Sequence, residues 1–340
     1  MEEGKKRSIF RILEKRQLIL LLIYSVGCLY LLYFSLTEKI SDKNQRQGMS
    51  NRGKQVREES YFKEVDYYVL RESDPFLRLK AQEMGIDHDR KRILFHDPQG
   101  VVYSKSNRPI NFKGLWGKFN FGSNQIYLNK KVRLTMEDMQ LDTDKLHYNL
   151  RTGYCTGTGN VITRKFSPVT KDKIRVDSDF VEVWTNNKRS HYQGNVSGVI
   201  QRKRVYETGI SFSTNDLYLD LERLLAELKG DVLLKKQTIT AKARRGEIFL
   251  DNYNKTLKYY ALYDDVKVNE VFVPQGKSVK VERKAFAEKV EGIVSEEKVV
   301  LTGNPKVIQG RDVIKGNKIV IRERNQTVEI DDATSKFLLR

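Results

Sequence analysis

Residues 181–196 read VEVWTNNKRSHYQGNV: an alternating run, a polar turn, a second run, and then Gly-Asn. Four further windows of 16 residues align with it without gaps: LHYNLRTGYCTGTGNV (146–161), LYLDLERLLAELKGDV (217–232), DNYNKTLKYYALYDDV (251–266) and VEGIVSEEKVVLTGNP (290–305). Period-two alternation bounded by polar turns indicates strands with one dry face. We therefore predict that the windows are hairpins that stack into an antiparallel β-architecture.

Four of the five windows carry Gly-Asn or Gly-Asp near their end, which we interpret as a break between repeats. These residues accept positive φ more readily than others do. The windows end 35, 36, 34 and 39 residues apart, at 161, 196, 232, 266 and 305. Window 217–232 also has leucines at helical spacing, but its place in the repeat predicts a hairpin instead.

An apolar segment, LILLLIYSVGCLYLLYFSL (18–36), precedes the repeats and contains no Lys, Arg, Asp or Glu. A helix of this length spans about 28 Å, close to the ~30 Å core of a bilayer. A lipoprotein signal processed at Cys28 is disfavoured, because the apolar run continues beyond that cysteine. A buried soluble helix would need a large core around it. We predict an uncleaved transmembrane anchor over residues 18–37.

The formal charge of +18 predicts an anionic partner. Residues 1–17 hold six basic and three acidic groups, a net +3, which leaves +15 for the chain beyond the anchor. Basic residues on the two sides of the anchor nearly tie, but a short N-terminal arm normally stays cytoplasmic. The +15 then lies outside the cytoplasm, where a phosphorylated lipid or another envelope polyanion is the expected partner and nucleic acid is not.

Five segments make up the chain besides the anchor. Residues 1–17 form the cytoplasmic arm, and residues 38–60, with few large apolar groups, are predicted to be a basic tether. The polar, Pro-containing stretch 165–173 is the best internal boundary. It divides the remainder into two β domains, 61–164 and 174–340.

The second β domain resembles the OstA-like β-jellyroll of the LptA family. The resemblance lies in ELKGDV (227–232), VVLTGNP (299–305) and KGNKIVIRE (315–323). The anchor and first domain resemble the LptC family, in EVDYYVLRESDPFLRLKAQEMGI (64–86) and QIYLNKKVRLTMEDMQLDTDKLHYNL (125–150). The two families are usually separate proteins, so this chain looks like a fusion; a long variant of the anchored protein alone is the alternative.

The resemblance implies an all-β fold, with two stacked antiparallel β-jellyroll domains after a single transmembrane helix. It places the anchor in the inner membrane and the C-terminal region in the periplasm. It implies a groove that shields the acyl chains of lipopolysaccharide, without chemistry on the lipid. Its implied partners are an inner-membrane ABC-type lipopolysaccharide extractor and, by edge-strand docking, other β-jellyroll bridge proteins or an outer-membrane translocon.

Apolar residues on the dry strand face are the candidate groove positions, although sequence phase does not distinguish a lipid trough from an ordinary packed core. They are Val196, Ile200, Leu219, Leu221, Val232, Leu234, Ile239, Val266, Val268, Ile319 and Ile321. Basic clusters near the rim are candidates for phosphate contact, or else form a solvated face. They are Arg202, Lys203, Arg204, Lys235 and Lys236.

Catalytic motifs are absent from the sequence: it has no GxSxG elbow, no HExxH and no Walker A loop. Asp142 and Asp144 lie near His147, but turn chemistry is the better interpretation, and Cys155 has no basic partner in the sequence. We expect a protein that is not an enzyme, with no catalytic residues, no metal and no cofactor. The competing hypothesis is an anchored β-repeat interaction protein that binds an envelope polyanion through its basic surface.

Overall fold

The computed structural model describes residues 60–336, apart from 72–73, 88–90, 104–107, 167–170, 202–208, 251–256, 274–279, 297, 323–327 and 332–333. The predicted anchor and tether lie outside these residues. No helix in the described part is long and apolar enough to cross a membrane. The described chain is built of β-strands and one short 3₁₀ helix, so the all-β prediction is confirmed.

The strands of the N-terminal half are β1 (Ser60–Arg71), β2 (Asp74–Asp87), β3 (Arg92–His96), β4 (Gln99–Tyr103), β5 (Pro109–Lys113), β6 (Trp116–Asn120), β7 (Gln125–Met136), β8 (Met139–Asn149), β9 (Tyr154–Phe166), β10 (Lys173–Trp184) and β11 (Arg189–Gln201). Those of the C-terminal half are β12 (Ile210–Asp220), β13 (Leu225–Lys236), β14 (Ile239–Leu250), β15 (Leu257–Phe272), β16 (Val281–Ile293), β17 (Lys298–Thr302), β18 (Lys306–Gln309), β19 (Asp312–Lys315), β20 (Lys318–Arg322), β21 (Val328–Asp331) and β22 (Thr334–Lys336), with η1 (Val294–Glu296) between β16 and β17.

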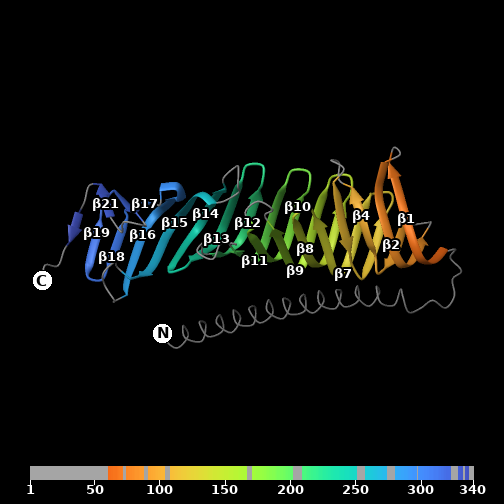
Figure 1. Ribbon diagram of the computed structural model, residues 1–340, viewed down its shortest axis with the longest axis horizontal. Helices are drawn as coiled ribbons and strands as arrows, with labels where there is room; N and C mark the ends of the chain where they lie inside the picture. The colour runs from red at the N-terminus through yellow and green to blue at the C-terminus, as the bar shows by residue number, and fades with distance from the viewer. Residues whose placement is uncertain are drawn as a thin grey trace, which may run out of the picture. The chain divides into compact units, whose positions relative to one another are not determined.

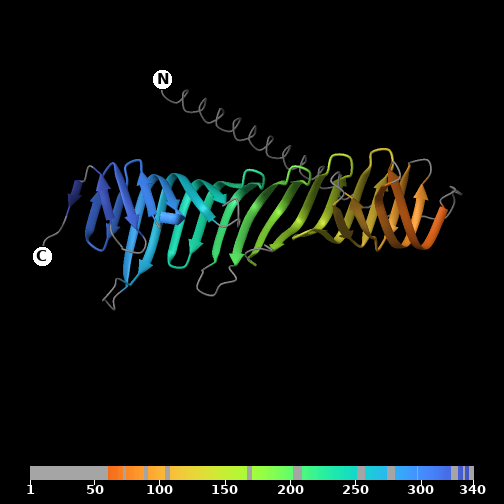
Figure 2. The ribbon, with the colours of Figure 1, turned by 45° about the horizontal axis from the view of Figure 1, so that its top comes forward.

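Strands β7 to β16 form an antiparallel meander in which each strand pairs with the next. Figures 1 and 2 show them side by side in chain order. The five sequence windows fall on alternate strand pairs, from β8–β9 to β16–β17, and window 251–266 contains β15 but no residue of β14. Window 217–232 is the hairpin of β12 and β13, as predicted, and the turns at 151–153 and 186–188 are also confirmed.

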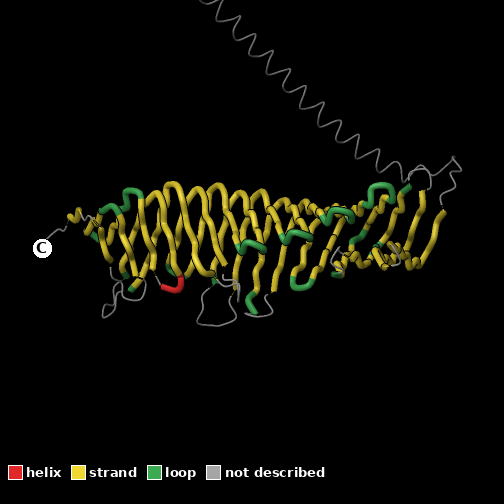
Figure 3. Tube along the Cα trace, turned by 90° about the horizontal axis from the view of Figure 1, so that it is seen from above, coloured by secondary structure: helices red, strands yellow, loops and turns green. Residues whose placement is uncertain are grey.

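The described unit has two arms, which are defined by the short strands at its two ends: each long strand there pairs with one short strand in each arm. The first half of β2 pairs with β4 and the second half with β3, while β7 pairs with both β5 and β6. Likewise β16 pairs with both β17 and β18. We call the side of β4, β5, β18 and β19 the first arm, and the side of β3, β6, β17 and β20 the second arm. Every long strand crosses from one arm to the other, and Figure 3 shows these strands following one another along the unit.

A corner of β-bulges joins the two arms, because the register shifts in the middle of every pair from β7–β8 to β15–β16. The Gly-Asn and Gly-Asp pairs lie at this corner. Gly159 and Asn160, for example, have φ of +80° and +46° inside the continuous strand β9. Our interpretation of these pairs as breaks between repeats was therefore wrong for Gly159, Gly194 and Gly230, which each bend a continuous strand. At Gly303 the interpretation holds, because β17 ends at Thr302 and β18 begins at Lys306.

At three of the bulges, those at Gly159, Gly194 and Gly230, the partner is a Ser or Thr followed by Asp or Asn on the neighbouring strand. The Thr214 hydroxyl donates to the carbonyl oxygens of Lys229 and Gly230, at 2.9 and 3.1 Å. The Asn160 amide donates to the Asp144 carboxylate at 2.7 Å, and Asn195 to Asp179 at 2.7 Å. Backbone groups that the bend removes from the ladder are thus satisfied by side chains.

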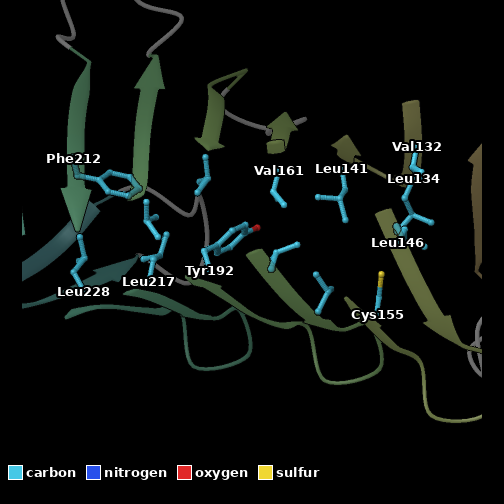
Figure 4. Packing of buried hydrophobic residues seen from close by; sticks show 14 of the residues in the cluster. Val132, Leu134, Leu141, Leu146, Cys155, Val161, Tyr192, Phe212, Leu217 and Leu228 are labelled. Carbon is cyan, nitrogen blue, oxygen red and sulfur yellow. The ribbon is translucent and has the colours of Figure 1, made fainter. Parts of the chain in front are cut away.

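One contiguous core lies between the arms. Strand alternation directs every second residue inward, for example Leu217 and Leu228, which are directly paired. Figure 4 shows Phe212, Val161 and Leu141 from the first arm facing Tyr192 and Cys155 from the second. The dry face predicted from the period-two pattern is therefore a filled core over these strands.

Aromatic rings cover glycines at three places, and two of these rings, Phe112 and Phe212, belong to the core. The pairs Gly100–Phe112, Gly198–Phe212 and Gly292–Tyr260 are each directly opposite one another on neighbouring strands. A Cβ at Gly198 would lie 2.2 Å from the Phe212 ring, and one at Gly292 2.0 Å from the Tyr260 ring. The absence of a side chain is what allows each ring to lie flat across the neighbouring strand.

The predicted internal boundary, 165–173, coincides with the hairpin between β9 and β10. These strands pair along their whole length, from Lys173 opposite Phe166 to Trp184 opposite Tyr154. The sheet is thus continuous across the boundary, and residues 59–340 form one compact unit. The division of the chain into two β domains stays a prediction.

Candidate lipid-binding site

The innermost candidate groove residues are fully enclosed by the core. Val196, Val232, Val266 and Ile319 are 1, 2, 1 and 0 % exposed. Leu219, Leu234, Val268 and Ile321 are partly buried and pack against the same core. The candidates thus lie on the inward face, and a lipid chain would reach the innermost four by displacing side chains of the facing arm.

A row of inward positions, four half-buried isoleucines and one exposed lysine, follows the tip of the first arm. Ile174, Ile200 and Ile210 are directly paired across β10, β11 and β12, and the pairing continues through Lys236 to Ile239 on β14. We call this row the rim. It contains the candidates Ile200 and Ile239, whereas the remaining candidate, Leu221, lies in the turn after β12.

The two described phosphate candidates point in opposite directions, because neighbouring residues of a strand face opposite sides of a sheet. Lys236 pairs with Ile210 and Ile239 and lies in the rim. Lys235 pairs with Ser211 and Thr240 on the outer surface of the first arm. The candidates Arg202, Lys203 and Arg204 lie outside the described residues.

An ionic cluster that the sequence did not suggest continues the rim beyond Ile239. Glu270, Arg283 and Gln309 follow in direct register on β15, β16 and β18. Arg283 is 6 % exposed and donates to Glu270 at 3.3 Å and to Gln309 at 3.0 Å. Its guanidinium carbon lies 4.6 Å from the centre of the Phe272 ring. Burial lowers the pKa of Arg283, and Glu270 opposes that shift.

The signal for this cluster was present in the sequence. Arg283 stands two residues before Ala285 and four before Ala287, hence at an inward position of the same strand. A charged residue in phase with a dry face requires a partner, because an unpaired buried charge is expensive. The partner, Glu270, is equally in phase with Val266 and Val268.

Neither of two surface hollows in the described part of the chain is lined by a candidate groove residue. One, of about 500 Å³, lies on the outer surface of the first arm and is lined by Arg78, Lys80, Lys113 and Arg133 among others. The other, of about 280 Å³, lies near Lys280 and Ile308.

The residues weighed for catalysis are kept apart by the fold. Asp142 is on the outer surface of the first arm and binds Arg133 at 2.6 Å, whereas Asp144 is at the corner. His147 is on the second arm, stacked on Tyr127 with ring centres 4.5 Å apart. Cys155 is fully buried, and burial raises the pKa of its thiol to about 12. Among the described residues no cluster of His, Cys, Asp or Glu is placed to hold a metal ion.

Comparisons with known proteins match two successive regions of the chain. A family described as lipopolysaccharide-assembly, LptC-related, matches residues 18–171, and one described as LptA/(LptD N-terminal domain) LPS transport protein matches residues 213–327. The crystal structure of LptH, the LptA homologous periplasmic component of the lipopolysaccharide transport device from Pseudomonas aeruginosa, is similar at 17 % identity. That likeness covers 38 % of this chain and 95 % of that one, with a TM-score of 0.34. Comparison with curated proteins gave no match.

Proposed function

We propose that this chain, in which an LptC-like region is followed by an LptA-like region, is a component of a lipopolysaccharide transport bridge. The observation that carries the proposal is the continuous sheet that runs through both regions. Strands β9 to β12 connect them without a missing pairing. One chain thus supplies an uninterrupted inward face where two separate proteins would have to dock.

The interior would shield acyl chains by opening along the rim. Among the described strands, all pairings run between neighbours within an arm, and none joins the rim of the first arm to the second arm. Separating the arms there costs side-chain contacts but no ladder hydrogen bond. Acyl chains entering the gap would restore apolar contact, at about 0.8 kcal/mol for each buried methylene. The candidate groove residues are the ones that such chains would touch.

The same proposal covers how the chain is held in the membrane and which neighbouring proteins its two ends contact. The apolar segment 18–36 would hold the chain in the inner membrane, with the β-structure in the periplasm, next to an ABC-type extractor. Strand β1 pairs with β2 on one side and with no second described strand. An unpaired strand edge is a template for strand addition, so β1 at one end and the last strands at the other would dock neighbouring β-jellyroll proteins. The proposal assigns no catalytic step to the chain.

A second function, binding of an envelope polyanion without lipid, is favoured by the outer surface of the first arm. Its outward positions include Arg164, Arg175, Lys242, Lys267 and Lys284, which are all exposed or paired at the surface. Such binding would weaken steeply with salt and would not depend on acyl chains.

Acyl dependence separates the two functions. We expect the full chain in detergent to bind lipopolysaccharide at least about 100-fold more tightly than its completely deacylated form, because only the former gains apolar burial. Affinity for the two ligands would be measured by isothermal titration calorimetry at low and high salt. Equal affinity for both, together with a strong loss in high salt, would establish polyanion binding instead.

A further inference from the structure

The hollow on the first arm gathers four cations over β2, β4, β5 and β7. Two cross-strand rows form its floor. Lys80, Gln99, Lys113 and Arg133 are directly paired in one row, and Arg78, Val101, Asn111 and Thr135 in the other. All lie at outward positions of rigid strands, so their spacing is set by the sheet.

The acidic residues at the borders of the hollow do not neutralise it. Asp66 on β1 binds Arg78 at 3.0 Å and Lys80 at 3.7 Å. Asp142 on β8 is shared by Arg133 and Arg164. The four cations of the hollow thus face two carboxylates, which leaves a net +2, and Arg164 at the border raises this to +3.

Lys113 lies between these two ion-pair groups. It makes no ion pair with any residue that the structure describes, and it is exposed. The pKa of Asp66 is lowered, first by the hydrogen bond from Arg78. For Asp142, burial acts to raise the pKa, but hydrogen bonds from Arg133, Gln140 and Arg164 outweigh it and the pKa is lowered. Both carboxylates therefore stay ionised and hold the outer cations in place, while the central cation remains available.

We propose that this hollow binds the phosphate-bearing headgroup of a glycolipid. The inference rests on the proposed function and adds a headgroup site on the outer surface to the acyl site inside. A guanidinium group can donate two parallel hydrogen bonds to the oxygens of one phosphate, and a lysine ammonium attracts the phosphate as a point charge. Gln99, Asn111 and Thr135 stand between the cations and offer donors and acceptors to sugar hydroxyls. A concave site of about 500 Å³ is better matched to a single sugar phosphate than to the flat surface of a bilayer.

The test uses the full chain in detergent and the diphosphorylated disaccharide left after complete deacylation of lipid A. We expect saturable binding that weakens at least about tenfold in the Lys113→Gln, Arg133→Gln double variant, because the two substitutions remove two of the charged hydrogen-bond donors that would face the phosphate. The matched control is Lys145→Gln, an exposed lysine on β8 in the second arm, which should bind like the original chain. Circular dichroism would establish that all variants keep their strands.

Three results would overturn the headgroup site: equal binding of the dephosphorylated disaccharide, an unchanged affinity in the double variant, or an equal loss in the control. Loss of binding to phosphatidylglycerol vesicles alone, with headgroup binding intact, would assign the surface to a membrane and also overturn it. Acyl-dependent binding of intact lipopolysaccharide would persist in each of these cases if the proposed function holds, so the two failures are distinguishable.

Discussion

Replacement of Tyr192 by alanine is expected to lower the free energy of unfolding by about 3–5 kcal/mol, the usual cost of deleting a large buried aromatic side chain. Tyr192 is 2 % exposed and is among the largest fully buried side chains described. It lies on β11, between neighbours from both arms (Figure 4). The cavity cannot be filled by a simple collapse, because the arms are tied together at the corner.

Urea unfolding of the full chain, followed by circular dichroism, measures this loss. The matched control is Tyr218→Ala on the neighbouring strand β12, where the side chain faces outward beside His191. That variant should lose less than about 1 kcal/mol. If Tyr192→Ala cost no more than Tyr218→Ala, the core between the arms would not be filled as described.

Replacement of Glu270 by leucine is expected to cost about 3 kcal/mol. It leaves the Arg283 guanidinium buried without its carboxylate, and breaking a buried pair from one side costs about 3–5 kcal/mol. The lower value applies because the Glu270 side chain is 28 % exposed and is partly solvated. Urea unfolding again provides the measurement.

The companion double variant, Glu270→Leu with Arg283→Met, should recover most of that loss, since an apolar pair of similar volume replaces a buried ion pair at little cost. If the double variant were less stable than Glu270→Leu alone, the Arg283–Glu270 contact would not be the reason for the stability lost in Glu270→Leu.

The fold class followed from the sequence because the period-two pattern and the polar turns are local signals. The hairpin at 217–232 shows the value of the repeat: a helical leucine spacing was present, but the phase shared with the other windows was the better guide. Successive residues of a strand face opposite sides of the sheet, so neighbouring leucines cannot both face inward. The phase shared with the other windows indicates which leucines do.

The corner was misinterpreted for a physical reason. Positive φ is equally required at a turn and at a β-bulge, so Gly230 and Asp231 alone do not distinguish the two. The distinguishing signal is the Thr-Asn at 214–215 sixteen residues earlier, whose hydroxyl caps the carbonyl of Gly230. The same signal recurs as Thr-Asp before Gly159 and as Ser-Asp before Gly194.

The inward direction of the candidate groove residues was predictable, but their enclosure was not. Alternation places Val232 and Leu234 on one face, yet it carries no information on whether the other arm covers them. Lys235 and Lys236 were grouped as one basic cluster, although alternation separates them onto opposite faces. The hollow of Arg78, Lys113 and Arg133 was missed because its residues come from strands that are distant in the sequence.

We propose that acyl chains of lipopolysaccharide occupy the space between the two arms. The most direct test places a photo-crosslinking residue in the full chain in cells, at the inward positions Leu219 and Val232, and at their outward neighbours Tyr218 and Leu233. Adducts would be detected by an antibody against lipopolysaccharide. We expect adducts at Leu219 and Val232 and few at Tyr218 and Leu233. No adduct at either inward position, or equal adducts at all four, would contradict it.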